Sequence, residues 1–276
     1  MRLENRVAIV TGGGRGIGKA IALAFAREGA QLVLADTLPE AQAVAKAVQA
    51  LGRQALAVKA DVSRRRDVEA IVAAALAEFG RVDILVNNAG VQPPIGPLWE
   101  NDPEEWLNTI LVNLGGVFLC CRAVVPVMIQ RGGGKIVNLS GGGATSARPR
   151  FTAYASSKAA VVSLTETLAH EVKEYNIQVN AIAPGAVNTR LTDEILAAGA
   201  AAGEETLERT RRQKETGGVP PDKAAALAVF LASDESDGLT GRLISAVWDD
   251  WESMTEHIDR IMASDLYTLR RVVESA

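Results

Sequence analysis

The chain has 276 residues, of which 48% are hydrophobic and 22% charged, a balance typical of a globular protein that excludes a disordered, collagen-like or coiled-coil chain. Its formal net charge of −4 gives no electrostatic footprint for nucleic acid. The two cysteines, Cys120 and Cys121, are adjacent and too close for an ordinary disulfide, which indicates a reducing compartment.

Targeting and metal-binding patterns are missing from the sequence as well. The N-terminus leads into only four apolar residues, 7–10, so it lacks the core of a signal peptide, and no apolar run approaches the ~18 residues of a membrane span. His170 and His257, with the adjoining cysteines, form no cluster of metal-ligand spacing. We therefore expect a cytoplasmic protein that binds no membrane, no nucleic acid and no catalytic metal.

Short apolar runs alternate with helix-length amphipathic segments up to about residue 247, a pattern typical of repeated β-α units around a parallel sheet. Strands are predicted at about 6–11, 31–36, 54–59, 82–87, 134–140, 177–183 and 242–247. Helices are predicted near 16–29, 39–51, 64–79, 103–131, 152–175 and 221–232. The sequence thus predicts an α/β fold with seven parallel strands in one domain, residues 1–247.

Two segments depart from this alternation. Residues 185–218 follow a strand end and show weak helical periodicity, which favours a mobile lid over a linker. Residues 248–276 form a tail whose tryptophans and aliphatic residues would give a helix one apolar face. We expect this tail to pack on its own domain or on a partner subunit, because an exposed apolar patch of that size is a liability.

A glycine-rich turn joins the first predicted strand to the first helix. Glycines here let the backbone turn sharply and approach a pyrophosphate, whose charge the helix N-terminus favours. A tight turn with no ligand is the alternative. The residues predicted to bind a dinucleotide at this turn are Gly12, Arg15, Gly16, Ile17 and Gly18.

Asp36 ends the second predicted strand, about 20 residues after the glycine turn. An acidic side chain there accepts hydrogen bonds from the adenosine ribose hydroxyls and repels a 2′-phosphate, which favours NAD over NADP. Two alternatives stay open. Asp36 caps the turn before Pro39, or Arg15 supplies a cation for NADP.

Small and amide residues follow the next two strands. Asp61 and Val62 come after the third strand, and the run 87–90, which includes Asn88, Ala89 and Gly90, comes after the fourth. Ligands of open α/β sheets bind at these carboxyl ends. Such residues permit close backbone approach, so we predict that these five contact the dinucleotide.

Tyr154 and Lys158 lie four residues apart at the start of a predicted helix, which puts both side chains on one helical face. Bringing a phenol from a pKa of ~10 to near neutrality requires about 4 kcal/mol of preference for the phenolate. A lysine ammonium and the positive ring of an oxidised nicotinamide can supply it. Tyr154 is then predicted to exchange a proton with an alcohol or ketone while hydride moves to or from the cofactor.

Together these segments resemble the short-chain dehydrogenase/reductase family, in its single-domain subgroup, over roughly residues 4–247. The motifs are Thr-Gly-x-x-x-Gly-x-Gly at 11–18, Asn-Asn-Ala-Gly at 87–90, Tyr-x-x-x-Lys at 154–158 and Pro-Gly at 184–185, in the order and spacing of the family. The resemblance implies a Rossmann-like, doubly wound parallel sheet and a nicotinamide cofactor. It also implies that Tyr154 is the catalytic acid/base and that Lys158 binds the nicotinamide ribose.

Further site residues follow only from this resemblance. Asn113 stands where the family has an asparagine that holds a water linking the lysine to solvent. The segment 184–189 resembles the one that contacts the nicotinamide amide, with Pro184, Gly185, Val187 and Thr189 as the predicted contacts. Homodimers or homotetramers are implied too, because the helices near 103–131 and 152–175 form subunit interfaces in relatives.

The chain departs from the family pattern at two places. The usual serine, thirteen residues before the tyrosine, is replaced by Gly141, and Ser140 lies one residue earlier. We predict that Ser140 polarises the substrate oxygen, with Thr145 or Ser146 as alternatives. Near the C-terminus the usual Asp-Gly-Gly run is absent, which leaves the far wall of the substrate pocket unpredicted.

The leading hypothesis is an NAD-dependent oxidoreductase that interconverts a secondary alcohol and a ketone on a small polar substrate. A 3-oxoacyl-thioester reductase using NADPH is the alternative within the same class, and a non-catalytic dinucleotide-sensing protein is the alternative outside it. Arg148 and Arg150 precede the catalytic helix and either meet an anionic substrate group or face solvent.

Overall fold

The computed structural model describes residues 1–271, in which seven parallel strands form one sheet in the order β3-β2-β1-β4-β5-β6-β7. The strands are β1 (Val7–Thr11), β2 (Gln31–Asp36), β3 (Ala55–Lys59), β4 (Ile84–Asn87), β5 (Gly134–Leu139), β6 (Ile177–Ala183) and β7 (Leu243–Ser245). This confirms the predicted Rossmann-like fold. The order reverses between β1 and β4, so a crevice opens where their carboxyl ends diverge.

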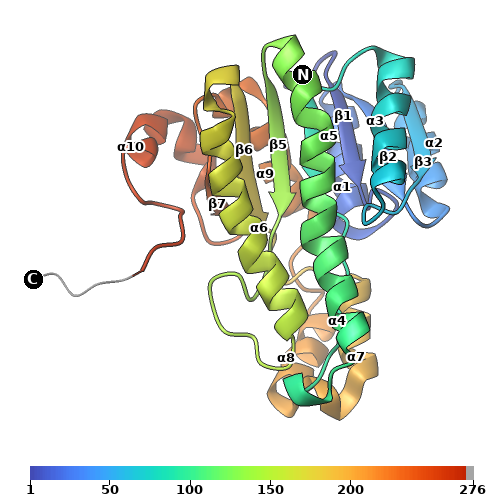
Figure 1. The fold of residues 1–276 in the computed structure, drawn as a ribbon, viewed down its shortest axis with the longest axis vertical. Helices are drawn as coiled ribbons and strands as arrows, with labels where there is room; N and C mark the ends of the chain where they lie inside the picture. The colour runs from blue at the N-terminus through green and yellow to red at the C-terminus, as the bar shows by residue number, and fades with distance from the viewer. Residues whose placement is uncertain (272–276) are drawn as a thin grey trace, which may run out of the picture.

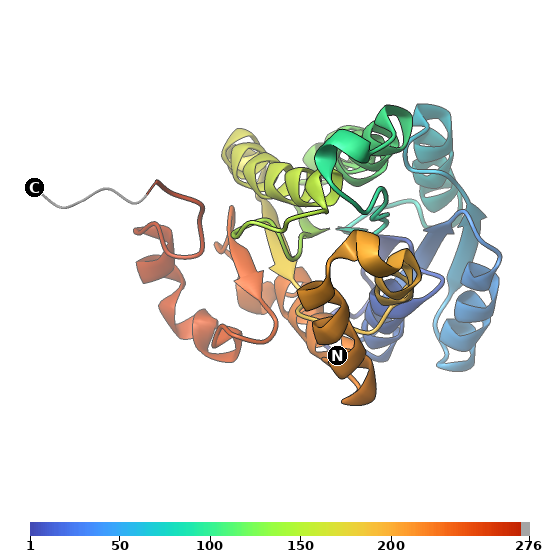
Figure 2. The same cartoon turned by 90° about the horizontal axis from the view of Figure 1, so that it is seen from below.

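Helices cover both faces of the sheet, as a doubly wound fold requires (Figure 2). One layer holds α1 (Gly16–Arg27), α2 (Glu40–Ala50) and α9 (Pro221–Ala232), and the other holds α3 (Arg65–Phe79), α5 (Gly116–Arg131) and α6 (Thr152–Glu171). At the carboxyl ends of the strands lie α4 (Pro103–Ile110), α7 (Arg190–Ala198) and α8 (Glu204–Glu215) (Figure 1). The segment 185–218 is thus largely helical.

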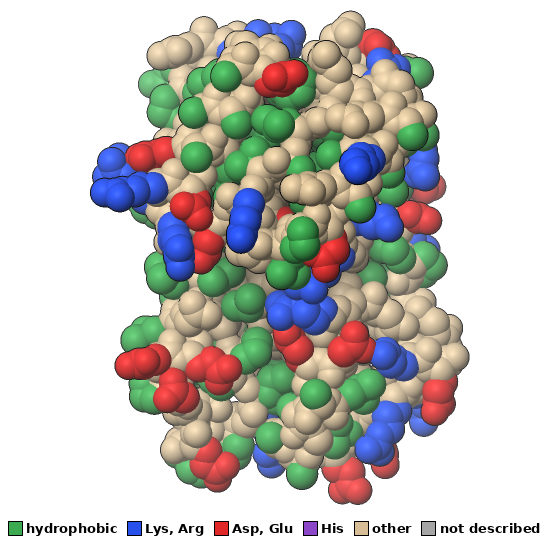
Figure 3. Space-filling model, turned by 90° about the vertical axis from the view of Figure 1, so that its right-hand side faces the viewer, with side chains coloured by type: hydrophobic (Ala, Val, Ile, Leu, Met, Phe, Trp, Pro, Cys, Tyr) green, Lys and Arg blue, Asp and Glu red, His purple; other side chains and the backbone are tan. Residues whose placement is uncertain are grey.

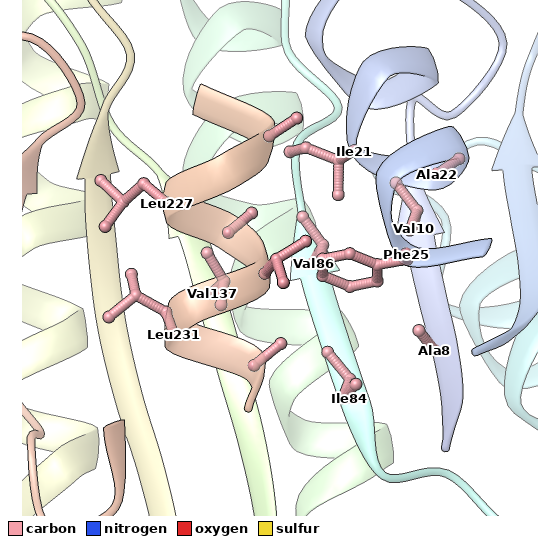
Figure 4. Packing of buried hydrophobic residues seen from close by; sticks show 14 of the residues in the cluster. Ala8, Val10, Ile21, Ala22, Phe25, Ile84, Val86, Val137, Leu227 and Leu231 are labelled. Atoms are coloured by element: carbon pink, nitrogen blue, oxygen red, sulfur yellow. The ribbon is translucent and has the colours of Figure 1, made fainter. Parts of the chain in front are cut away.

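The core layer behind the sheet is built by the apolar faces of α1 and α9 (Figure 4). In α1 the buried residues recur at helical spacing, with Ile21 and Phe25 directed at the strands. They meet Val10 and Val86 from β1 and β4, the two strands that flank the crevice. Full burial of a side chain the size of Phe25 stabilises the fold by roughly 2–3 kcal/mol, so this packing fixes α1 and the glycine turn that begins it.

The predicted helix 103–131 is three segments in one line: α4, a π-helical turn at Leu111–Gly115, and α5. Over 18 residues its mean hydropathy reaches 2.0, so among residues 1–271 this helix passes a length-and-composition test for a membrane span. Unbroken apolar runs in the sequence had predicted no such span, and the apolar run in this helix is interrupted by Arg122. The helix lies on the sheet between α3 and α6 (Figure 2), and core helices pass the same test.

The tail folds back beside β7. A 3₁₀ helix (Trp251–His257) leads into α10 (Ile258–Met262), and Met254 and Ile261 are buried against the α9 layer. The Leu243 amide of β7 donates a hydrogen bond of 2.8 Å to the Tyr267 carbonyl. Trp248 stays 86% exposed, so the tail buries only part of its apolar surface. Residues 272–276 of the predicted tail lie outside the described residues.

Charged side chains of both signs are interspersed on the face shown in Figure 3. The basic run 64–66 at the start of α3 is paired locally, with Arg65 2.7 Å from Glu69 and Arg64 3.4 Å from Asp61. Within the described part of the chain, no group of three His, Cys, Asp or Glu side chains is placed to hold a metal ion.

Candidate active site

A cleft of about 660 Å³ lies at the carboxyl ends of the strands, closed on one side by the start of α7. Most of the predicted site residues line it: Gly12, Arg15, Gly16, Ile17, Asp36, Asp61, Val62, Asn88, Ala89, Gly90, Ser140, Tyr154, Lys158, Pro184 and Thr189. Four do not, because Gly18, Asn113, Gly185 and Val187 stand behind the lining. The structure therefore brings most of the predicted cofactor and catalytic residues to one cavity.

The glycine turn is braced from the neighbouring strand. Asn88 donates from its amide nitrogen to the carbonyls of Thr11 and Gly12, each at 3.0 Å. A Cβ at Gly18 would stand 2.1 Å from the Gly12 carbonyl oxygen and 2.5 Å from Nδ2 of Asn88, so no other residue fits there. Gly12 itself has φ +62°, a conformation that glycine adopts without strain.

Thr11, the first residue of the glycine-rich motif, also helps to build the site, although its sequence position alone did not predict this. Its hydroxyl donates to the Val86 carbonyl and accepts from the backbone amides of Asn88 and Ala89 at 3.0 and 3.1 Å. One buried hydroxyl thus ties the ends of β1 and β4 together. Asn88 and Thr11 shape the floor of the cleft, which leaves backbone groups rather than the Asn88 amide to face a ligand.

Asp36, at the end of β2, lines the cleft at the end away from Tyr154 and Lys158. One carboxylate oxygen accepts from the Gly14 amide at 3.0 Å and the other from the Leu38 amide at 3.1 Å. Each oxygen keeps lone pairs for a ligand hydroxyl, since an ionised carboxylate has about four acceptor sites. Asp36 therefore orders the glycine turn and still presents acceptors to the cavity.

Asn113 occupies the π-helical turn and is fully buried. Its side-chain oxygen accepts from the Val91 amide at 2.8 Å, and its nitrogen donates to the Val91 carbonyl and to Ser157 Oγ, both at 2.9 Å. The side chain therefore anchors the strand end after Gly90 to α6. Such π turns occur frequently at functional sites, and here the turn places Asn113 behind the Gly90–Lys158 wall.

Tyr154 and Lys158 are buried on one face of the first turns of α6. Lys158 Nζ lies 5.6 Å from the Tyr154 ring centroid and donates to the Leu139 carbonyl at 2.8 Å. Burial lowers the pKa of Lys158 to about 8. Burial also raises the pKa of Tyr154, and the charge and donor groups of Arg148 oppose that rise.

Ser140 points its hydroxyl away from the phenol. It donates to the Lys158 carbonyl at 3.0 Å, so only acceptor capacity is left toward a substrate oxygen. A Cβ at Gly141 would stand 2.9 Å from Tyr154 Oη, which makes position 141 the one beside the phenolic oxygen. The role predicted for Ser140 stays a prediction, and its hydrogen bond gives it a second role as a tie between β5 and α6.

The cover of the cleft begins at Thr189, which caps α7 through a reciprocal pair of hydrogen bonds with Thr192. Gly185 packs against Val247 and Val219, and Val187 is buried with its carbonyl accepting from Thr192. Thr189 lines the cleft itself, whereas Gly185 and Val187 lie behind its lining. A separate apolar cluster joins α6 to α7 and α8: Phe151, Tyr154, Ile195, Ala202 and Leu207.

The sheet order, the glycine turn and the buried Tyr-x-x-x-Lys pair together define a nicotinamide-dependent oxidoreductase site. A family model described as short chain dehydrogenase matches residues 6–199. The chain belongs to the short-chain dehydrogenase/reductase family, whose members are NAD(P)-dependent oxidoreductases acting on CH–OH groups, and it is such an enzyme.

Relatives with various substrates resemble most of the chain. The 3-oxoacyl-[acyl-carrier-protein] reductase of Thermotoga maritima is 37% identical, covering 88% of this chain and 97% of the relative. The galactitol 2-dehydrogenase of Agrobacterium fabrum is 38% identical, covering 92% of this chain and all of the relative. Among solved structures, an NAD⁺-bound xylitol dehydrogenase superposes with a TM-score of 0.82 at 29% identity, covering 89% of this chain and 98% of that one.

Proposed function

We propose that this enzyme interconverts a secondary alcohol and a ketone on a small polar substrate, using NAD and with Tyr154 as the acid/base. The observation that carries the proposal is that Asp36 lines one end of a single cleft and Tyr154 with Lys158 the other. One end supplies acceptors for ribose hydroxyls, and the other a buried proton-transfer group. An extended dinucleotide fits between them.

The residues present fit a nicotinamide dinucleotide. Gly12 and Gly16 leave room for close approach of a pyrophosphate to the start of α1, and Asp36 has free lone pairs for the adenosine ribose. Lys158 lines the same cleft and would bind the nicotinamide ribose. When bound, the cofactor accepts or supplies the hydride, and Tyr154 takes up or delivers the proton of the substrate oxygen.

The preference for NAD rests on charge at the end of β2. The Asp36 carboxylate is 9% exposed and held by two backbone amides, so it cannot swing away from a 2′-phosphate. The next side chain, Thr37, carries no positive charge. Arg15 also lines the cleft, and its positive charge supports the NADP alternative.

A small polar substrate fits the space and the neighbours. A cleft of about 660 Å³ that must hold a dinucleotide as well as the substrate leaves room for a small substrate beside Tyr154. Two of the relatives are named for the polyols galactitol and xylitol. We therefore infer a polyol, sugar or hydroxy acid as the substrate class.

The thioester alternative is favoured by one observation, the likeness to a 3-oxoacyl-[acyl-carrier-protein] reductase. That activity usually goes with NADPH, and Asp36 disfavours a 2′-phosphate. The two functions therefore differ in two measurable properties, the cofactor preference and the size of the substrate.

A panel of polyols, sugars and hydroxy acids with NAD⁺ and NADP⁺, and a 3-oxoacyl thioester with NADH and NADPH, tests the proposal. We expect turnover of a small hydroxy compound with NAD⁺ and its loss in Tyr154→Phe, with Tyr175→Phe as the matched control. A variant Tyr154→Phe that keeps the parent kcat would refute the assigned role. Turnover of the thioester alone, with NADPH, would replace the proposed function by the alternative.

A second copy of the chain is the partner we infer, in a homodimer or homotetramer. On the α4–α5 line the apolar side chains of Leu107, Leu111 and Phe118 are each at least half exposed. Leu107 and Leu111, four residues apart, share one helical face, and Phe118 follows on the same line of helices beyond the π-helical turn. We expect the mass in solution to be a multiple of 29.1 kDa, and Phe118→Arg to lower it without loss of helical circular dichroism.

We also infer a cytoplasmic location. Cys120 and Cys121 are free and buried, and burial raises the pKa of Cys121 to about 12. Free thiols are typical of proteins in a reducing compartment. Because these two are buried and stay protonated, they also resist oxidation.

A further inference from the structure

Position 141 raises a question about the chemistry of Tyr154. The structure puts this position beside the phenolic oxygen, yet Gly141 has no side chain to offer. Ser140, the neighbouring hydroxyl, donates to the Lys158 carbonyl. Lys158 donates to the Leu139 carbonyl and lies 5.6 Å from the ring centroid. None of these groups donates a hydrogen bond to the phenolic oxygen in this structure.

Arg148 is the other cation at this place. It comes from the loop between β5 and α6, and its guanidinium carbon lies 5.0 Å from the centroid of the Tyr154 ring. The same carbon lies 4.2 Å from the centroid of Phe151, whose side chain is fully buried and provides a rigid platform. An arginine stacked on two aromatic rings is held in one place, unlike one that extends into solvent.

A buried amide fixes the outer end of the guanidinium. Gln92 is 1% exposed, and its side-chain oxygen accepts from Arg148 Nη2 at 3.2 Å. Its nitrogen donates to the Leu191 carbonyl at 3.2 Å, in the first turn of α7. Both polar atoms of the Gln92 amide are thus hydrogen-bonded, so Gln92 links Arg148 to the first turn of α7, which covers the cleft.

We propose that Arg148 is the positioning residue for Tyr154 in this enzyme, taking over at the phenol the task of the side chain that Gly141 lacks. The guanidinium stabilises the phenolate by its charge and keeps the ring oriented through the stack with Phe151. Gln92 transmits the position of α7 to Arg148. The inference rests on the proposed role of Tyr154 as the acid/base.

The electrostatics of the pocket agree with this assignment. Desolvation raises the pKa of Tyr154, while the charge and donor groups of Arg148 lower it, so removal of the guanidinium raises that pKa further. The other charged groups that face this pair are Lys158 on α6 and Arg209 on α8, and the charge of Arg209 acts on Arg148. A nearby charge in such surroundings shifts a pKa by about 1 or more.

Substrate binding is the competing role for Arg148. An arginine that met a carboxylate of the substrate would have to reach the cleft, and Arg148 is not among the residues that line it. Its guanidinium is engaged with two rings and an amide oxygen instead. The contacts therefore point to action through Tyr154.

Titration of the tyrosines in the cofactor-free protein tests the proposal directly. The chain has three tyrosines, Tyr154, Tyr175 and Tyr267, so the phenolate absorbance of the parent minus that of Tyr154→Phe isolates the step of interest. Arg148→Met removes the charge at similar length, and Arg148→Lys keeps a charge without the planar stack. Arg150→Met is the matched control, because the Arg150 guanidinium donates instead to the Ala201 carbonyl, in the segment between α7 and α8.

In Arg148→Met we expect the Tyr154 step to move up by about 1 in pH or to leave the accessible range while circular dichroism stays native. Below the pKa, a rise of 1 lowers the phenolate fraction tenfold, and the pH profile of kcat should move by the same amount with KM nearly constant. Arg148→Lys should recover part of the shift, and Arg150→Met should leave the Tyr154 step in place.

An unchanged Tyr154 step in Arg148→Met would overturn the proposal, and so would a rise confined to KM for acidic substrates. These outcomes are distinct from a failure of the proposed function. In that case Tyr154→Phe would retain turnover, whatever the titration of the tyrosine shows in the Arg148 variants.

Discussion

Replacing Lys158 by methionine should make the cofactor-free protein more stable at neutral pH while removing its activity. Lys158 is buried, and burial lowers its pKa from 10.5 to about 8. The folded protein therefore binds a proton at this site less readily than the unfolded chain does. Folding at pH 7 carries a penalty for holding a charged ammonium in that place, and methionine has no such charge to bury.

The size of the effect follows from the two pKa values. Their gap of about 2.5 corresponds to about 3 kcal/mol at 1.36 kcal/mol per pKa unit. The hydrogen bond from Lys158 to the Leu139 carbonyl is lost in the variant, which offsets roughly 1–2 kcal/mol. We expect a net gain of about 1–2 kcal/mol in the free energy of unfolding at pH 7.

The pH dependence gives the sharper measurement. Between about pH 8 and 10.5 the unfolded chain holds more protons at this lysine than the folded one, so the stability of the parent should rise with pH in that window. Urea unfolding of Lys158→Met should lack this rise, whereas exposed Lys173→Met should keep it. A variant less stable than the parent at pH 7, with the same slope, would refute the reasoning.

Three further outcomes are expected. Gly18→Ala should cost at least 1–3 kcal/mol and weaken NAD⁺ binding, because its Cβ overlaps the Gly12 carbonyl oxygen, whereas Gly142→Ala has open space and should change urea unfolding little. Asp36→Asn should lower kcat/KM for NAD⁺ roughly tenfold or more and raise it for NADP⁺; an unchanged ratio would contradict the charge argument. Desolvation raises the pKa of Asp83, but hydrogen bonds from Arg81, Val7 and Arg131 outweigh it, so the pKa is lower in the folded protein than in the unfolded chain. The ionised Asp83 therefore stabilises the fold above the unfolded pKa, and this stabilisation is lost as pH falls through the folded pKa. Asp83→Asn should therefore lower the free energy of unfolding at pH 7 by about 2 kcal/mol, a value limited by the partial exposure of both arginines. Its melting temperature should also fall less steeply than that of the parent as the pH is lowered.

Local patterns made the fold predictable. The five inner strands, β1, β2, β4, β5 and β6, are short runs with buried residues on both faces, and the glycines mark where β1 ends and α1 begins. The ends of these elements differ from the prediction by a few residues, and β7 covers only Leu243–Ser245, after which the chain turns with Ser245 Oγ accepting from the amides of Val247 and Trp248. The joint spacing of the motifs was enough to predict most residues that line the cleft.

Long-range side-chain contacts could not be predicted from spacing. Nothing in the sequence around Ser140 shows that its hydroxyl bonds to the Lys158 carbonyl eighteen residues later. The link from Gln92 to Arg148 spans 56 residues, and that from Gln92 to Leu191 spans 99. The π turn at Asn113 was likewise hidden, because an apolar helical pattern continues across it.

The bond between Leu243 and Tyr267 has a consequence for how this chain can be shortened. β7 is the last strand of the sheet, and the returning tail occupies part of its outer side. Ending the polypeptide at Val247 would leave that rim with unsatisfied amides, an invitation for other molecules to add a strand. We therefore expect the tail to hinder the association of two sheets through β7, and a chain that ends at Val247 to aggregate more readily in solution than the full chain.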